Sequence, residues 1–367
     1  MRRLLGVAAA LVDSELVPGD VALEDGVVAA VGLPVGSGGL AVPGFVDLQV
    51  NGYAGVDFLT SDAEEWAVAA RAMARDGVTA YVANLITSSF DLITRSVQVG
   101  GEVVAEGEPG AARCLGVHLE GPFLAPRRRG THPLRHLREP DRSLLEPVLA
   151  AGPVVGVTIA PELPRAVGLI TWLSSTRVLV SLGHSDATAE QAHDGFDAGA
   201  RAVTHVFNGM SQPTSRAPGL TGVALARDDV AVQMICDGVH LAPETAALVV
   251  AAAGSRFVLV TDALSAAGAP DGRYRLGDVE VTKADGRARN DDGRLAGSVL
   301  SMPGAVRNAI AAGATIEQAV AAATTRPAAL LGRSDLGRLR PGDRADVAVL
   351  DDSLEVAATY VAGVPVQ

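Results

Sequence analysis

The sequence predicts an α/β protein, a (β/α)8 barrel of the TIM type beside a small β-domain built from both chain ends. From residue 45 onward, short runs rich in Val, Ile and Leu alternate with longer Ala-rich stretches of helical spacing, as expected for βα units. There are eight such runs, and their starts lie 24 to 40 residues apart, which leaves room for one helix in each gap. A doubly wound open sheet is the alternative architecture.

The eight predicted strands place residues 44–334 in the barrel. In chain order they are Phe45–Val50, Thr79–Leu85, Cys114–Glu120, Val154–Ala160, Val178–His184, Ala202–Phe207, Val230–Cys236 and Phe257–Asp262. Residues 1–43 and 335–367 lack the βα rhythm and read as short strands between Gly, Pro and Asp turns, so together they predict the small β-domain. The polar, turn-rich segment Tyr274–Arg294 predicts an inserted β-ribbon near the last barrel strand.

Composition excludes several classes of protein. Of the 367 residues, 48% are hydrophobic and 20% are charged, which is typical of a folded globular chain rather than a disordered one. No apolar run is long enough to cross a bilayer. The formal net charge of −12 argues against general binding to nucleic acid or to anionic membranes. We therefore expect a small-molecule partner, with no nucleic acid and no membrane.

The two cysteines and the chain start predict a cytoplasmic protein. Cys114 and Cys236 lie in apolar strand-like runs, so a disulfide framework is not expected and a reducing compartment fits. Arg2 and Arg3 before an apolar stretch resemble the start of a signal peptide. However, no small-residue cleavage pattern follows, and the next strand-like run, Asp20–Val31, is typical of a hairpin.

Ionisable residues gather at the carboxyl ends of the predicted strands, where barrel enzymes do their chemistry. They are Asp47, Glu120, His184, His205, Asp237 and Asp262. A charge in the middle of a strand would have to be paired inside a packed core, at a cost of roughly several kcal/mol. Packing alone does not explain six such placements, so the sequence predicts a site there.

Three of these residues form a candidate metal site. Glu120, His184 and His205 offer one carboxylate and two imidazoles on different strands, a set that suits zinc or another divalent transition metal with open positions for water. Taken singly, each histidine could equally have a hydrogen-bonded structural role. Asp262 could be a further ligand, a carboxylate that caps the following turn, or the general base for an activated water.

Six segments, in order along nearly the whole chain, resemble those of N-acetylglucosamine-6-phosphate deacetylases, in the amidohydrolase superfamily. They are Pro43-Gly44-Phe45-Val46-Asp47, His118-Leu119-Glu120-Gly121-Pro122-Phe123, Gly183-His184-Ser185, Thr204-His205-Val206-Phe207-Asn208-Gly209-Met210, Asp237-Gly238-Val239-His240 and Thr261-Asp262-Ala263. The first segment is shared by the whole superfamily, whereas the second and fourth together are close to diagnostic of the deacetylases. The resemblance implies the barrel and the small β-domain, and a hydrolase that yields glucosamine 6-phosphate and acetate.

The chain departs from the superfamily after the first strand. Where the superfamily commonly has His-x-His and a second metal, this chain has Gln49-Val50-Asn51, and amides are poorer ligands than imidazoles. The resemblance therefore implies one divalent metal per subunit on Glu120, His184 and His205, with zinc as the first choice and iron(II) or another transition metal as alternatives. Gln49 and Asn51 could orient water or substrate through hydrogen bonds, or could be simple turn residues.

The resemblance also implies the catalytic and substrate-binding residues. Asp262 would serve as general acid and base, and His132 would contact the acetyl carbonyl. The phosphate would be bound by Asn208, Gly209, Arg216 and His240, with one contact crossing the interface of a homodimer. The basic run 127–129 fits a solvated surface loop better than a phosphate site.

Two other functions remain open from the sequence. Another amidohydrolase, acting on a cyclic amide, as a deaminase or on an N-acyl amino acid, would use nearly the same ligands. A barrel that binds a sugar phosphate without turnover is the alternative from a different class. Retention of Asp262 beside the ligand set argues against it, because a binding protein needs no general base.

Overall fold

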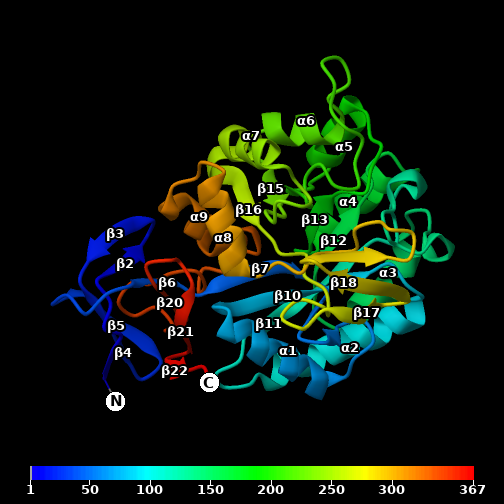
Figure 1. Cartoon of the computed structure of the whole chain (residues 1–367). Coiled ribbons are helices and arrows are strands. Elements are labelled where there is room, and N and C mark those ends of the chain that lie inside the picture. Colours follow the sequence, from blue (N-terminus) through cyan, green and yellow to red (C-terminus); the bar gives the residue numbers. More distant parts are fainter. Residues whose placement is uncertain (1) are drawn as a thin grey trace.

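The computed structural model describes residues 2–367, and its centre is one parallel sheet of eight strands (Figure 1). The strands are β7 (Phe45–Val50), β10 (Val78–Ile86), β11 (Arg113–Glu120), β12 (Val154–Ile159), β13 (Leu179–Leu182), β14 (Ala202–Val203), β15 (Ala231–Met234) and β16 (Phe257–Leu259). Each strand pairs with its neighbours in chain order. A parallel bridge between Val50 and Ala263 joins the first strand to the chain just past the last, so the sheet closes into the predicted barrel.

Helices surround the barrel and connect its strands. They are α1 (Ala63–Arg75), α2 (Phe90–Glu106), α3 (Arg142–Ala151), α4 (Ala166–Ser175), α5 (Ala189–Asp197), α6 (Gly219–Ala226), α7 (Pro243–Ala253), α8 (Met302–Ala311), α9 (Ile316–Ala323) and α10 (Thr325–Leu330). Within residues 2–367, none of them combines the length and apolar character needed to cross a bilayer. Several begin with a capping box, as at Asp62 and Thr188, where the side chain accepts a backbone N–H that the helix leaves unpaired.

Four barrel strands end two to four residues earlier than the sequence predicts, and the difference falls on functional positions. β13, β14, β15 and β16 stop at Leu182, Val203, Met234 and Leu259. Beyond three of these ends, His184 (φ 48°), His205 (φ 23°) and Asp262 (φ 50°) have left-handed backbones that L-residues adopt at a cost of about 1 kcal/mol each. The backbone turns there, so these side chains leave the strand direction and point into the barrel mouth.

Both chain ends contribute strands to sheets beside the barrel. One sheet contains β1 (Arg3–Leu4), β4 (Asp20–Glu24) and β5 (Val27–Leu33). The other has the order β22-β21-β20-β6-β2-β3, with β2 (Ala9–Val12), β3 (Glu15–Pro18), β6 (Leu40–Pro43), β20 (Val347–Leu350), β21 (Val356–Val361) and β22 (Val364–Pro365). Antiparallel pairing of β20 with β6 joins the two ends of the chain. The division into domains at residues 43 and 335 stays a prediction.

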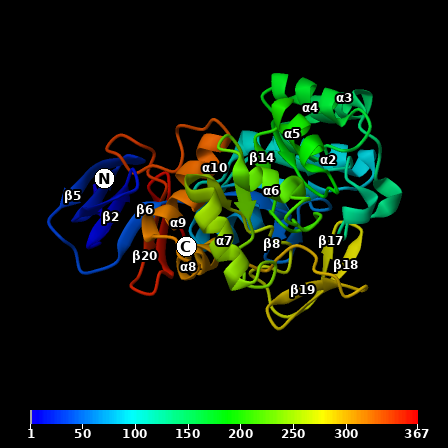
Figure 2. The same cartoon turned by 90° about the horizontal axis from the view of Figure 1, so that it is seen from above.

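The predicted ribbon near the last barrel strand is present. It comprises β17 (Gly272–Leu276), β18 (Val279–Ala284) and β19 (Arg287–Asn290). Figures 1 and 2 show the ribbon and the sheets of the chain ends on opposite flanks of the barrel. A short hairpin, β8 (Gly52–Tyr53) with β9 (Val56–Asp57), supports the ribbon, because Asp57 accepts a hydrogen bond from the backbone N–H of Gly277.

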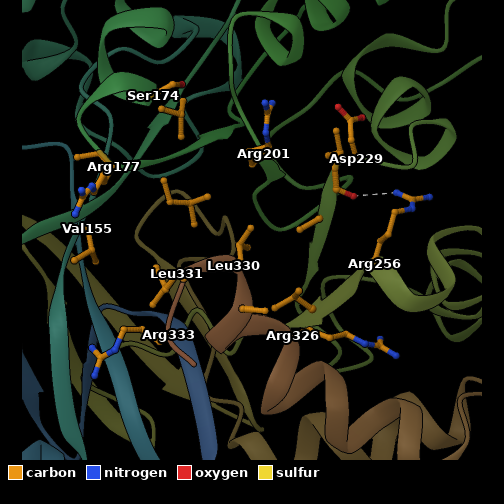
Figure 3. Close-up of a pocket in the computed structure, with 18 of the residues that line it drawn as sticks. Val155, Ser174, Arg177, Arg201, Asp229, Arg256, Arg326, Leu330, Leu331 and Arg333 are labelled. Carbon is orange, nitrogen blue, oxygen red and sulfur yellow. Dashed lines mark hydrogen bonds between the residues drawn. The ribbon is translucent and has the colours of Figure 1, made fainter. Parts of the chain in front are cut away.

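Arginines line a hollow of about 1020 Å³ at the amino-terminal end of the barrel (Figure 3). Arg256 donates to the carbonyls of Ala224 and Leu225 at the end of α6, of Ala252 at the end of α7, and of Val230. Arg201 and Arg326 bond nearby carbonyls in the same way. Several of these carbonyls lie in the last turns of α5, α6 and α7, so the guanidinium groups also offset the negative ends of these helix dipoles. We therefore interpret the hollow as structural.

Replacing Arg256 with Ala should lower the free energy of unfolding by about 3 kcal/mol, because four carbonyls lose a charged donor. Urea denaturation would measure this difference. Arg273→Ala, at a side chain that is 83% exposed, is the control and should change stability by less than about 0.5 kcal/mol. Equal effects of the two substitutions would contradict the structural role.

Candidate active site

The predicted site residues meet in a pocket of about 180 Å³ at the carboxyl end of the barrel. Its lining includes nine of them, namely Asn51, Glu120, His132, His184, His205, Asn208, Gly209, His240 and Asp262. Gln49 is buried and bonds two of the lining carboxylates. Arg216 does not line this pocket. The ribbon contributes Leu276, which the sequence did not single out, and the chain after it contributes Leu295.

Three side chains converge as a metal site requires. The Nε2 atoms of His184 and His205 lie 2.8 and 3.0 Å from Oε1 of Glu120, and 3.1 Å from each other. All three residues are buried, and their ligand atoms lie within 4.8 Å of one another. Donor atoms about 2.0 to 2.1 Å from a shared tetrahedral ion would be separated by similar distances. The arrangement therefore fits one divalent cation.

The second nitrogen of His184 supports this interpretation. Nδ1 of His184 lies 2.8 Å from the carbonyl oxygen of Arg128, an acceptor, so Nδ1 carries the proton and Nε2 presents its lone pair to Glu120 and His205. Burial lowers the pKa of His205, so its imidazole is also favoured in the neutral form that binds metals. Two lone pairs and a carboxylate facing one point are repulsive unless a cation or a proton lies between them.

The two carboxylates of the pocket have opposite pKa shifts. Burial alone would raise the pKa of Glu120, but the neighbouring imidazoles of His132, His184 and His205 outweigh it and hold the pKa well below its usual value. Burial also raises the pKa of Asp262, and the nearby negative charge of Glu120 raises it further. One acid is thus kept ionised and the other is poised to hold a proton, as acid and base roles require.

An amide network joins the two carboxylates. Nε2 of Gln49 lies 3.4 Å from Oε2 of Glu120 and 3.3 Å from Oδ1 of Asp262, and Nδ2 of Asn51 lies 2.8 Å from that same Oδ1. Asn84, on β10, donates to both Asn51 and Glu120. Asn84 was not among the residues predicted from the sequence. The available signal was a single amide in an otherwise apolar strand, one residue before its predicted end.

His132 is oriented as a neutral donor. Its Nδ1 accepts a hydrogen bond from the backbone N–H of Thr87 (3.3 Å), which leaves the proton on Nε2. Nε2 lies 3.8 Å from Oε1 of Glu120, at the edge of the metal site. Burial lowers the pKa of His132, so the imidazole stays uncharged while its N–H faces the pocket.

The same pocket also offers groups that suit an anion. Nδ1 of His240 lies 2.7 Å from Oδ2 of Asp237, and this hydrogen bond orients the ring. Burial would raise the pKa of Asp237, but its hydrogen bond to His240 lowers it overall. A Cβ on Gly209 (φ 62°) would lie 2.8 Å from Nδ1 of His184, so only glycine brings this backbone so close. Arg216 lies instead in the exposed loop before α6, which projects beyond that helix (Figure 1).

Asp47 does not belong to the pocket lining, although it lies on a strand with the site residues. It is 2% exposed and accepts hydrogen bonds from Oγ1 of Thr261 at 2.6 Å and from two backbone N–H groups. Burial raises its pKa to about 7 despite these bonds. Its contacts tie the first barrel strand to the segment that carries Asp262, so its role is structural.

A barrel with a Glu/His/His cluster and an acid at its carboxyl end is the architecture of a metal-dependent hydrolase. The chain belongs to the amidohydrolase family, whose sequence pattern it matches over residues 40–366. It is 37% identical to N-acetylgalactosamine-6-phosphate deacetylase of Escherichia coli O157:H7, covering 99% of this chain and 97% of that one. It is 39% identical to human N-acetylglucosamine-6-phosphate deacetylase, covering 89% of this chain and 83% of the human one.

A solved structure is similar along the whole chain. A mutant of N-acetyl-D-glucosamine-6-phosphate deacetylase from Mycobacterium smegmatis, in complex with N-acetyl-D-glucosamine-6-phosphate, superposes with a TM-score of 0.94 at 35% identity. The match covers 100% of this chain and 99% of that one. The fold and the family resemblance predicted from the motifs are therefore confirmed.

In Asp47→Asn, the melting temperature should fall less than in the wild-type protein as pH rises from about 4 to about 7. In the unfolded chain the Asp47 carboxyl has a pKa near 3.8, whereas in the folded protein its pKa is about 7. Between these values the folded protein binds a proton that the unfolded chain has released, so the wild-type protein loses stability as pH rises through this range. Melting temperatures across this range would measure the slope. Asp352→Asn, at an exposed position, should leave it unchanged. A wild-type slope in Asp47→Asn would refute the assignment.

Proposed function

We propose that this protein removes the acetyl group from N-acetyl-D-glucosamine 6-phosphate, leaving D-glucosamine 6-phosphate and acetate. The convergence of Glu120, His184 and His205 beside Asp262 in one buried pocket carries the proposal. The names of the similar proteins support this choice of substrate, as does the large share of each chain that the matches cover. Three other substrates are less favoured, namely a cyclic amide, the substrate of a deaminase and an N-acyl amino acid. The similar proteins described above are all named for an N-acetylhexosamine phosphate.

Glu120, His184 and His205 would hold one divalent metal ion, for which we propose zinc, with iron(II) as the main alternative. Bound there, it would polarise the amide carbonyl and make a water molecule nucleophilic at neutral pH. Gln49 and Asn51 already donate to the carboxylates, and these hydrogen bonds occupy the region where the superfamily commonly has a second metal site. We therefore propose a single metal.

Asp262 would move the proton between water and the leaving amine. Its Oδ1 is held by Asn51 and Gln49, which leaves the other oxygen to accept the proton of the attacking water. The raised pKa of this carboxyl favours keeping that proton until the amine nitrogen takes it. The Nε2–H of His132 would donate to the acetyl oxygen as negative charge develops there, in the role of an oxyanion donor.

The phosphate would be bound by the backbone of Gly209 and by the side chains of Asn208 and His240. These groups line the same pocket as the metal site. Arg216 lies in the projecting loop, so we propose that it reaches the pocket of the partner subunit in a homodimer. We also propose a cytoplasmic location, because both cysteines are buried and free.

N-acetyl-D-galactosamine 6-phosphate is the second candidate substrate. A relative named for that sugar phosphate matches this chain over nearly its whole length. The two sugars differ in the orientation of one hydroxyl.

The deciding experiment is acetate release by the purified protein from both N-acetylhexosamine 6-phosphates and from unphosphorylated N-acetylglucosamine. We expect release from a phosphorylated sugar, its loss on chelation, and its return on adding zinc. Asp262→Asn, which keeps the size of the side chain but not the base, should lower kcat by about 10² to 10⁴-fold. No release by the zinc-loaded protein from either phosphorylated sugar would refute the proposal.

Arg216→Ala should raise KM for the phosphorylated sugar about tenfold or more, because a bidentate charged contact is lost. Activity toward the unphosphorylated sugar should not change, which provides the control.

Mixing Arg216→Ala with Asp262→Asn tests the homodimer. Half of the dimers formed at random contain one chain of each variant. If the arginine serves the partner subunit, each of these mixed dimers has one complete site of its two, so about a quarter of wild-type activity should be recovered. No recovery would place Arg216 in its own site or outside both.

A further inference from the structure

We propose that Asn84 is a positioning residue that fixes both carboxylates of the site through one side-chain amide. Asn84 lies on β10 near the carboxyl end of the barrel and is 1% exposed. Its Nδ2 lies 2.7 Å from Oε2 of Glu120 and 2.8 Å from Oδ1 of Asn51. It does not line the pocket, so it would act through its neighbours rather than on the substrate.

The partners of Asn84 determine which way its amide faces. Oε2 of Glu120 is an acceptor 2.7 Å away, so the NH2 group of Asn84, not its carbonyl oxygen, faces it. The same NH2 group has a second hydrogen, which points to Oδ1 of Asn51. Both donors of Asn84 are thereby used.

The first hydrogen bond determines which oxygen of Glu120 faces the metal site. Asn84 holds Oε2, and the weaker contact from Gln49 reaches the same oxygen. Oε1 is left alone toward the histidine nitrogens, 2.8 and 3.0 Å away. A carboxylate held in this way presents one oxygen in a fixed direction, which lowers the conformational cost of binding a cation.

The second hydrogen bond determines the direction of Asn51, and through it of Asp262. Because Oδ1 of Asn51 accepts from Asn84, its NH2 group must face the other way, toward Oδ1 of Asp262 at 2.8 Å. One oxygen of the general base is therefore held while the other stays available. A chain of two amides thus couples the orientation of the ligand to that of the base.

The carbonyl oxygen of Asn84 argues against a role in stability alone. It is a buried atom with no hydrogen-bond partner within residues 2–367. An unpaired buried acceptor is costly, and an apolar side chain of the same shape would avoid that cost. The position therefore carries an amide at some expense to folding, which we attribute to the two donors that the carboxylate network needs.

The test compares Asn84→Ala and Asn84→Leu with the wild-type protein. Leucine has the same number and branching of side-chain heavy atoms as asparagine but no donors, so it guards against a cavity that prevents folding. Both variants should bind zinc about ten- to hundredfold more weakly in competition with a chromophoric chelator. At saturating zinc, both should lose kcat by a similar factor, with KM changed less than about threefold because Asn84 does not contact the pocket.

Ser96→Ala is the matched control, because Ser96 is also buried and loses a hydrogen bond, to the carbonyl of Phe58, remote from the pocket lining. It should lower the melting temperature while leaving zinc affinity and kcat unchanged. Wild-type zinc affinity and kcat in folded Asn84→Ala or Asn84→Leu would overturn the inference, whatever their melting temperature. The kinetic readout rests on the proposed function, but zinc affinity is measured without substrate, so failures of the two proposals can be told apart.

Discussion

Placing two carboxyl groups in one buried pocket is the constraint on which the rest of the site depends. Neither Glu120 nor Asp262 can be ionised there without donors, since an unpaired charge in a protein interior costs several kcal/mol, roughly. Glu120 has three histidines and an asparagine around it, whereas Asp262 has only amide donors and the repulsion of its neighbour. The different surroundings separate the pKa values of two similar groups, and that separation gives each a different role.

The barrel supplies the geometry that this constraint requires. Parallel strands bring their carboxyl ends to one edge, but a side chain on a regular strand points alternately into the barrel or out toward the helices. His184, His205 and Asp262 escape this alternation because the chain turns into a left-handed conformation at each of them. The local cost of that backbone is offset by bonds that hold the turns, such as the one from the N–H of Asp262 to the carbonyl of Gln49.

Much of this organisation could be predicted from the sequence. The eight-strand rhythm and the charges at the strand ends are regular signals of period and position, and they located Glu120, His184, His205 and Asp262. What the sequence could not give depends on contacts between distant segments. Asp47 has the sequence position of a strand-end charge, but its carboxylate accepts a hydrogen bond from Thr261. Asn84 is a polar residue in an apolar strand, and its role depends on the hydrogen bond to Glu120, which lies 36 residues further along the chain. The early ends of the strands were also missed, because apolar runs continue past the point where the backbone turns.

The pairing of β6 with β20 sets an order of events for the growing chain. These strands are separated by about three hundred residues, so β6 leaves the ribosome with its partner still unmade. One of its edges is covered by β2, but the other presents free N–H and C=O groups until β20 has been made. An open strand edge is a template for pairing with another chain. The nascent protein therefore exposes an open strand edge at β6, and pairing with β20 ends that exposure.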